Sequence, residues 1–499
     1  MLGMWPVLGD AGPVIGRRPI WFPLRALFVV GTAALFGTST LGAGFAAAER
    51  PVVDPALLPA PAPAAPPEPT EQRNACVAVS AVPDGTGVPD EIGTLDFGAV
   101  WPITRGAGQL VAVIDTGVSP HPRLPGLRPG GDYVHTGDGL SDCDAHGTLV
   151  AGLIAATREP GSGFSGGAPE AQIISIRQSS NAFQRERQAG EEEGDSSVEN
   201  ATGYGNVMTM AMAVRTAADL GATVINISEV ACVPGGTGVA DGPLGAAIDY
   251  AARVKDVVVV AAAGNTGGAG GSACSSQNPS PDPADPFADQ WNRIATVATP
   301  AWFDDQVLTV GSVDSSGAPA AFTLAGPWVD VAAPGTSMTS LSPTGTGLVN
   351  GTVDNQGNIA PIQGTSFSAP LVAAVAALVR AHRPELDAAQ VIERIEATAH
   401  APAEGWNPLV GHGVVDPLAA VTGQVDGLRG TAPADAVAIP MPTVPVPPDT
   451  RPRSVALAGA AAVGVVLVLG LGVSIPLRKR ARPHSAGSAV ASGSGPRPS

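Results

Sequence analysis

Short apolar runs rich in β-branched residues recur along the middle of the chain. They cover residues 110–114, 173–176, 224–227, 257–260 and 307–310. Runs of this length predict buried strands, and stretches with helical spacing lie between them, such as residues 205–220 and 244–254. Strands that alternate with helices predict a mostly parallel sheet with helices on both faces. We therefore expect one α/β domain over residues 76–425.

A longer apolar run lies near the C-terminus. Residues 455–475 hold no charged residue and would span about 31 Å as a helix, the thickness of a bilayer core. The basic residues 478–480 and Arg482 follow this run, so the positive-inside rule places residues 476–499 in the cytoplasm. A buried core helix is the alternative, but the length of the apolar run and the basic residues after it argue against this interpretation. We expect a single-pass protein of the cell membrane, with the α/β domain on the extracytoplasmic side.

The first 48 residues have the pattern of an export signal. Arg17, Arg18 and Arg25 form a basic region, Ala26–Phe45 is apolar with small residues, and residues 46–48 form an A-x-A cleavage site. Residues 1–48 are therefore predicted to be a signal peptide that is removed after Ala48. An uncleaved membrane anchor is the alternative interpretation of the same pattern.

Proline-rich segments flank the α/β domain. Residues 49–75 and 426–454 predict extended, semi-rigid segments, an N-terminal arm and a linker to the apolar run. Inside the domain, residues 178–202 carry six acidic residues without an apolar period, which predicts a mobile surface loop. This acidic segment is either a solvated insertion or a loop that binds a partner or is itself cleaved.

Composition and charge exclude several functions. The chain has 499 residues and a formal net charge of −17, although residues 451–499 contain seven basic residues and no acidic one. The acidic balance of the remaining chain argues against nucleic acid as a partner. The only two lysines, Lys255 and Lys479, do not follow a Gly-rich run, so a Walker-type phosphate loop is absent from the sequence.

All four cysteines lie in the part of the chain that we expect outside the cell: Cys76, Cys143, Cys232 and Cys274. An oxidising compartment favours two disulfides, and the sequence leaves three connectivities open. A zinc site is the alternative, but the sequence contains neither C-x-x-C nor H-E-x-x-H. We expect no metal site and no cofactor.

Three short segments carry polar residues at the predicted ends of strands or starts of helices, where an α/β fold exposes side chains. A predicted strand runs into Asp115, a helix of small residues is predicted to begin at His146, and Ser366 precedes an Ala-rich helix. Each has an ordinary structural explanation: a turn-capping Asp, a structural His and an N-cap Ser. However, Thr365 and Ser368 are equally able to cap the helix, so capping alone does not account for Ser366.

Asp115 begins the tripeptide Asp-Thr-Gly, which is also the signature of aspartic proteases. That mechanism needs a second carboxylate to share the proton, and the sequence has no other Asp-Thr-Gly and no Asp-Ser-Gly. The order Asp, His, Ser, each in a turn flanked by glycine, instead matches the order of the triad residues in subtilisin.

In these segments the chain resembles the subtilisin family of serine proteases. VAVIDTGV, DAHGTLVAG, INIS, VVVVAAAGN and GTSFSAP are similar to the successive motifs of that family, over about residues 110–425. The resemblance implies a subtilisin-like three-layer α/β fold and a serine endopeptidase that forms an acyl-enzyme on Ser366. It also implies His146 as the general base, Asp115 as the group that orients the imidazole, and Asn265 as the side chain of the oxyanion hole.

The chain departs from the family pattern after Ser228. The family continues with Leu-Gly-Gly, a strand that pairs with the substrate, whereas this chain has Glu229 and Val230. By resemblance we expect Ser228, Glu229, Val230 and Gly264 to bind a protein or peptide substrate. A β-branched side chain in place of glycine should narrow the primary pocket, so a small residue such as Ala is expected before the scissile bond.

The order of segments along the chain, the four cysteines and the acidic insertion resemble those of the mycosins, membrane-anchored subtilisin-like proteases of actinobacterial type VII secretion systems. The resemblance implies that the chain processes secreted substrates and belongs to the secretion membrane complex. Two alternatives remain: a structural stabiliser of that complex with dispensable proteolysis, and a degradative subtilase of the cell surface. The motif order also implies the disulfides Cys76–Cys143 and Cys232–Cys274, with the N-terminal arm wrapped on the domain rather than folded into a large prodomain.

Overall fold

The structure is a computed structural model that describes residues 50–82, 93–186, 203–267, 274–282, 285, 289–354, 356–425, 428 and 451–480. The predicted signal peptide and the predicted cytoplasmic tail beyond residue 480 lie outside the described residues. The chain divides into two compact units, Met1–Ala432 and Pro433–Ser499, and each is described by itself.

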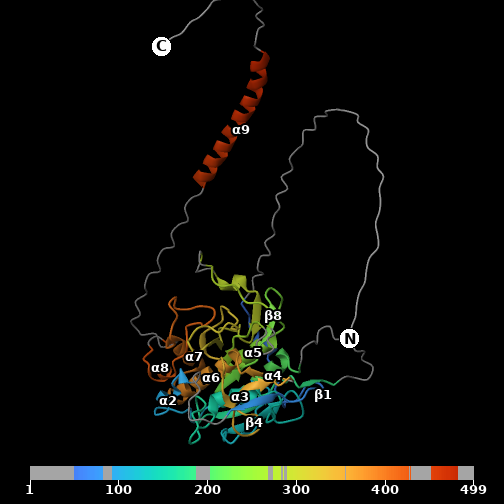
Figure 1. Cartoon of the computed structure of the whole chain (residues 1–499), viewed down its shortest axis with the longest axis vertical. Helices are drawn as coiled ribbons and strands as arrows, with labels where there is room; N and C mark the ends of the chain where they lie inside the picture. Colours follow the sequence, from blue (N-terminus) through green and yellow to red (C-terminus); the bar gives the residue numbers. More distant parts are fainter. Residues whose placement is uncertain are drawn as a thin grey trace, which may run out of the picture. The chain divides into compact units, whose positions relative to one another are not determined.

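A seven-stranded parallel sheet forms the centre of the first unit (Figure 1). In spatial order its strands are β12 (Val331–Pro334), β11 (Val307–Val313), β9 (Val258–Ala262), β7 (Val224–Ile227), β3 (Leu110–Asp115), β5 (Gln172–Arg177) and β4 (Leu127–Asp132). Every neighbouring pair runs parallel. The five predicted strands are confirmed, with ends that differ by up to three residues.

Helices cover both faces of this sheet. One face carries α3 (His146–Ala155), α6 (Thr365–His382), α7 (Ala388–Ala397) and α8 (Pro417–Thr422), and the short helix α2 (Phe97–Val100) packs with them. The other face carries α4 (Val207–Asp219) and α5 (Gly242–Asp249), which continues into the π-helix η2 (Tyr250–Val254). Side chains of β3 alternate between the two cores, since Val111 and Val113 lie in the first and Ala112 and Ile114 in the second. The predicted α/β fold with three layers is confirmed.

The strand order reverses at β3. From β3 the chain moves to one side for β4 and β5, and then to the other side for β7, β9, β11 and β12. Loops leave the carboxyl ends of adjacent strands in opposite directions at such a point, and the crevice between them is where open α/β sheets bind ligands. Asp115 is the last residue of β3, so the fold places it at this crevice.

Smaller antiparallel pairs complete the first unit. β14 (Leu348–Val353) pairs with β13 (Ser340–Leu341), β15 (Ile359–Pro361) and β2 (Ala78–Val82). β8 (Ala231–Pro234) pairs with β10 (Thr296–Thr299), and β1 (Thr70–Gln72) pairs with β6 (Phe183–Arg185). Two 3₁₀ helices, η1 (Pro55–Leu57) and η4 (Gln290–Arg293), lie in connecting segments.

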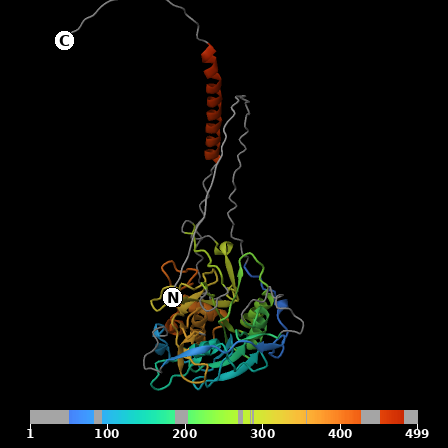
Figure 2. The ribbon, with the colours of Figure 1, turned by 45° about the vertical axis from the view of Figure 1, so that its right-hand side comes forward.

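The described part of the N-terminal arm lies against the domain (Figure 2, blue beside the green helices). Leu58 and Ala64 pack on the core that contains α4 and α5, and Arg215 of α4 donates a hydrogen bond to the Pro59 carbonyl at 2.7 Å. Further along, the Cys76–Cys143 disulfide joins the arm to the loop before α3. The arm is thus extended but packed, because its apolar residues and carbonyl groups find partners on the helices.

The acidic segment differs from its prediction as a mobile loop over 178–202. Its first residues are packed, since Gln178 and Ser180 are buried and Phe183 begins β6. The pairing of β6 with β1 of the arm satisfies the backbone of this part, which no local sequence pattern reveals. Residues 187–202, which hold most of the acidic side chains, lie outside the described residues.

The described part of the second unit is one helix, α9 (Arg451–Arg480), 30 residues long. It contains the whole apolar run 455–475, and its apolar segment Val455–Leu469 has exposed side chains. Among the described residues, α6 is the one helix long and apolar enough to cross a membrane by length and composition, but it is the buried central helix of the first unit, and Val455–Leu469 of α9 is a shorter apolar helix.

Candidate active site

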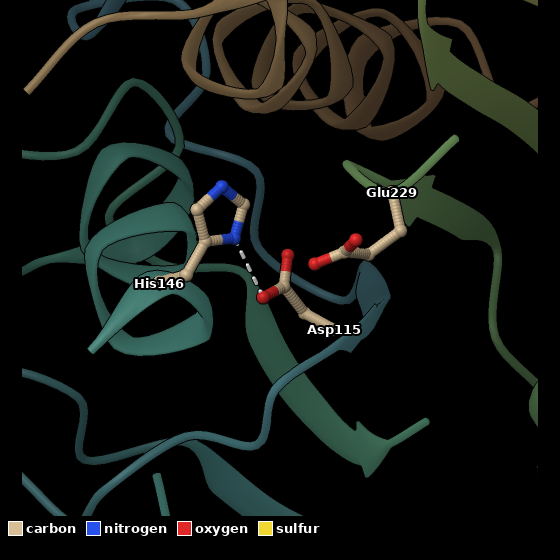
Figure 3. Close-up of side chains that lie close together, drawn as sticks. All are labelled: Asp115, His146 and Glu229. Carbon is tan, nitrogen blue, oxygen red and sulfur yellow. Dashed lines mark hydrogen bonds and ion pairs between the residues drawn. The ribbon is translucent and has the colours of Figure 1, made fainter. Parts of the chain in front are cut away.

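Asp115 is held at the end of β3 with no exposed surface. Its Oδ1 accepts a hydrogen bond from the Thr116 backbone N–H at 2.7 Å and lies 3.3 Å from the Thr116 hydroxyl oxygen. The same oxygen lies 2.7 Å from Nδ1 of His146 (Figure 3). The Thr116 N–H and the His146 ring N–H are two donors on one oxygen, and they fix the carboxylate so that it can hold the imidazole in one orientation.

His146 is the first residue of α3, as the sequence predicted. Two glycines allow this helix end to approach β3, because a Cβ on Gly147 would lie 2.1 Å from the Gly117 carbonyl oxygen. The Gly147 N–H donates to the Thr116 hydroxyl at 3.0 Å, which ties the helix end to the strand end. The His146 side chain remains 24% exposed, so its ring is fixed on one side and accessible on the other.

A second carboxylate, Asp142, supports this junction. Its two oxygens accept from the Thr116 hydroxyl at 2.9 Å and from the Thr148 N–H and hydroxyl at 2.8 and 2.6 Å. Burial outweighs these hydrogen bonds and raises the pKa of Asp142 to about 6. Asp142 was not singled out from the sequence. Its position four residues before His146 is the sequence signal that could have indicated a supporting role.

Ser366 lies in the first turn of α6, with 7% of its surface exposed. The N-cap is Gly364 without a side-chain cap bond, so the interpretation of Ser366, Thr365 or Ser368 as an N-cap is wrong. No hydrogen bond joins Ser366 to His146 within the described residues, but the ring of Phe367 packs on the His146 ring with centroids 5.0 Å apart. Such hydrogen bonds often form only when substrate binds.

Ser228 lies behind the nucleophile. Pro370 has no N–H, so the Ser366 carbonyl lacks its usual partner one helical turn later. The Ser228 hydroxyl donates to that carbonyl at 2.8 Å instead, and it accepts from the Asn226 amide at 2.8 Å. Ser228 is only 5% exposed and lies under the segment that carries Ser366.

Asn265 follows β9 and reaches the same loop. Its Oδ1 accepts from the Thr365 backbone N–H at 2.9 Å and from the Thr365 hydroxyl at 3.0 Å. The amide nitrogen is therefore directed to the other side, where a Cβ on Gly364 would lie 3.2 Å from it and 3.0 Å from Ser366 Oγ. A donor beside the nucleophile and the first N–H groups of α6 form the arrangement that an oxyanion needs. Thr365 was missed as the residue that orients Asn265.

Glu229 lies beside the Asp115–His146 pair. Figure 3 shows its carboxylate pointing at Asp115 from the segment after β7, and ligand atoms of the three residues lie within 4.8 Å of one another. Among the described residues this is the group arranged most like a metal site. Because Nδ1 of His146 is already engaged by Asp115, we assign the three residues to acid–base chemistry.

The charges around His146 shift its titration. Burial favours the neutral ring, but the charge and hydrogen bond of Asp115, then Glu229 and Asp142, outweigh burial and raise the pKa of His146 to about 9. Burial and the charge of Asp115 raise the pKa of Glu229 to about 7, against the opposing effect of His146.

The remaining expected substrate contacts lie near these groups. Val230 is half-buried and packs on the cores of both sheet faces. Gly264 has a φ of +104°, and a Cβ there would lie 3.1 Å from Cys274 Sγ, so this position requires glycine. Cys274 is joined to Cys232 of β8, which links the segments after β7 and β9.

Comparison with known proteins agrees with this geometry. The subtilase family profile matches residues 106–413, which is more than half of the chain. The chain therefore belongs to the subtilase family, and it is a serine endopeptidase of the subtilisin type. Thermitase of Thermoactinomyces vulgaris, for example, is 33% identical over 56% of this chain and 77% of that protein.

Within the subtilases the chain belongs with the mycosins. Mycosin-4 of Mycobacterium tuberculosis is 52% identical over 415 residues, which cover 83% of this chain and 86% of that protein. The crystal structure of MycP1 from Mycobacterium smegmatis matches with a TM-score of 0.69 at 42% identity, over 79% of this chain and 100% of that chain. A chain of the intact ESX-5 inner membrane complex matches with a TM-score of 0.70 at 44% identity, over 86% and 100%.

Proposed function

We propose that Asp115, His146 and Ser366 carry out the peptide-bond cleavage of this endopeptidase, with Asn265 in the oxyanion hole. The observation that carries the proposal is the Asp115–His146 hydrogen bond at the strand-order reversal, beside the loop that presents Ser366. The four side chains come from four different segments, at the ends of strands or at the starts of helices. These segments meet at one edge of the sheet, where substrate has access.

In the proposed mechanism His146 Nε2 takes the Ser366 hydroxyl proton as Oγ attacks the peptide carbonyl carbon. Asp115 stabilises the imidazolium, while the Asn265 amide and the Ser366 N–H bind the oxyanion. Collapse breaks the C–N bond, and the imidazolium gives its proton to the departing amine. Water then hydrolyses the ester on Ser366 with His146 again as base, which restores the enzyme and releases the acid product.

The peptide substrate should carry a small residue before the scissile bond. Val230 replaces a glycine of the family pattern and its side chain is fixed by packing on both cores, so it cannot easily withdraw. In a peptide library, cleavage after Ala should exceed cleavage after Phe at least tenfold, and Val230→Gly should reduce this preference. Equal cleavage after both residues by the wild-type chain would contradict the narrow pocket.

Two variants test the catalytic assignment in the same library. Ser366→Ala should yield no fragments. Asn265→Ala should lower kcat by about 10²–10³-fold with a small change in KM, the effect that loss of this donor has in subtilisin itself. Fragments released by Ser366→Ala at the wild-type rate would overturn the assignment.

We propose further that α9 anchors the protease in the membrane. Its apolar run 455–475 is long enough for the bilayer core, and basic residues follow it. The full chain should resist alkaline extraction from membranes, whereas a chain that ends at residue 450 and has lost residues 1–48 should be extracted. Release of the full chain by alkali would argue against the anchor.

The anchored protease is proposed to be a component of a type VII secretion membrane complex. Support comes from its similarity to a chain of the intact ESX-5 inner membrane complex and to mycosins, which favours this role over a degradative surface subtilase. On native gels of solubilised membranes, wild type and Ser366→Ala should both migrate with a large assembly. A structural role without catalysis would be favoured if Ser366→Ala also left secretion and substrate processing unchanged.

A further inference from the structure

One oxygen of the Asp115 carboxylate, Oδ2, has no role in orienting His146. Oδ1 accepts hydrogen bonds from the Thr116 N–H and from His146, whereas Oδ2 is buried without a hydrogen-bond partner among the residues that the structure describes. A buried carboxylate oxygen that lacks a donor destabilises the folded state, because the hydrogen bonds that it made with water are not replaced. A proton donor is therefore expected near Oδ2.

Glu229 is the side chain that points there (Figure 3). Its carboxyl group lies within 4.8 Å of both Asp115 and His146, it is half-buried, and the Ser179 hydroxyl bonds to it from the loop after β5. Two carboxylates this close do not both ionise readily, so one of them retains a proton. Asp115 has two donors that stabilise its charge, the Thr116 N–H and the His146 ring N–H, so the proton belongs on Glu229.

We propose that Glu229 is a positioning residue of the catalytic pair: in its protonated form the carboxyl donates a hydrogen bond to Asp115 Oδ2, and in its ionised form its charge holds His146 in the protonated, inactive state. This role rests on the proposed function of Asp115 and His146. It makes Glu229 the residue that sets the pH at which proteolysis begins, rather than a contact for the substrate.

Among the described residues, the charged groups that act on His146 and Glu229 most strongly are, apart from these two, carboxylates. Asp144 and Asp142 approach from the loop before α3, Asp115 from β3 and Glu229 from the end of β7. Glu229 and His146 titrate as a coupled pair, since loss of the Glu229 proton strengthens the attraction for the proton on His146. Neutral imidazole, the form that acts as base, therefore appears only at a higher pH than it would without Glu229.

Removing the charge while keeping a donor, as in Glu229→Gln, should let His146 lose its proton at lower pH. The rate of covalent labelling of Ser366 by a fluorophosphonate depends on the same neutral imidazole and needs no knowledge of the natural substrate. The midpoint of its pH profile should fall by about one unit, which is about tenfold faster labelling below that midpoint.

The experiment uses the full chain in detergent, as wild type, Glu229→Gln and Glu385→Gln. Glu385 provides the matched control because it is exposed and follows α6, whose 18 residues separate it by about 27 Å from the end that holds Ser366. The control should keep the wild-type midpoint. A purely structural role of Glu229 would lower the alkaline plateau of the labelling rate and leave the midpoint in place, which would overturn the proposal.

A second measurement separates this proposal from the triad assignment. In the Ser366→Ala background, NMR of ¹⁵N-labelled histidine gives the titration of His146 with and without Glu229→Gln, assigned by His146→Gln. A lower midpoint with Glu229→Gln supports the proposal even if wild type is not labelled, in which case only the triad function fails. An unchanged His146 midpoint overturns the role of Glu229, whether or not Ser366 reacts.

Discussion

At the scale of single residues, the site depends on backbone groups that have lost their usual partners. Pro370 leaves the Ser366 carbonyl without a helical donor, and Ser228 supplies one from a segment 138 residues away. Thr365 similarly uses its N–H and hydroxyl to orient Asn265 across the loop. These contacts mean that the nucleophile and the oxyanion donor are fixed by their neighbours before substrate binds, which is where such sites gain their rate.

Ser228→Ala should show what that support contributes. The Ser366 carbonyl and the Asn226 amide both lose a partner, so the free energy of unfolding should fall by about 1–3 kcal/mol. We also expect kcat to fall at least tenfold because the nucleophile loop is less firmly held. Urea unfolding and peptide hydrolysis measure the two effects, and Ser228→Thr, which keeps the hydroxyl, is the control. Unchanged stability and kcat in Ser228→Ala would show that the hydrogen bond contributes nothing.

The residue types of the triad could be read from the sequence, whereas their supports could not. Asp115, His146, Asn265 and Ser366 stand in motifs whose order is visible along the chain. The supporting contacts join segments that are distant in sequence and use common residues, so no local pattern marks them. Glu229 shows most clearly what a sequence pattern cannot predict. Its sequence position indicated a substrate contact, and only the fold shows that its side chain reaches Asp115.

At the scale of the elements, the position of α3 relative to β3 determines whether the catalytic pair forms. Thr116, next to Asp115, receives the Gly147 N–H and donates to Asp142, so one residue connects strand, loop and helix. Gly147 makes the close approach possible, because its neighbours are the Gly117 carbonyl and the Cβ of Asp115. The strands were predictable because buried β-branched runs are strong signals, but this distance between two elements is a property of packing.

Gly147→Ala tests the approach of α3 to β3. The added methyl group would lie 2.1 Å from a backbone oxygen, so the helix end must shift and move His146 away from Asp115. We expect kcat/KM to fall by about 10²-fold or more, as misplacement of catalytic groups by about 1 Å costs this much. Gly98→Ala in α2, where the nearest atom lies at 3.4 Å, is the control and should retain activity. Peptide hydrolysis by Gly147→Ala at the wild-type rate would contradict the argument.

At the scale of the whole molecule, activity and stability should respond to pH in opposite directions. Asp115, Glu229 and Asp142 outweigh burial and raise the pKa of His146 to about 9, above the usual 6.5. The folded state therefore binds a proton between pH 6.5 and 9 that the unfolded state has released. The resulting stabilisation is complete below pH 6.5 and is lost as pH rises to about 9, where the neutral base becomes available.

This linkage can be isolated with His146→Gln, which removes the titrating ring. The free energy of unfolding of the wild-type chain, relative to His146→Gln, should decline between pH 6.5 and 9, while peptide hydrolysis by the wild type rises over the same range. Urea unfolding at a series of pH values measures the first quantity. A difference that stays constant across this range would show that His146 has an ordinary titration in the folded state.

The central claim is that an assembled and accessible Ser366–His146–Asp115 site exists in this chain. Fluorophosphonate labelling of the full chain, followed by mass mapping of the labelled peptide, tests it most directly. The account predicts one adduct, on Ser366, that forms faster at alkaline pH and is absent from Ser366→Ala and much slower to form in His146→Gln. A folded wild-type chain that stays unlabelled up to pH 10, or a label that persists in Ser366→Ala, would contradict it.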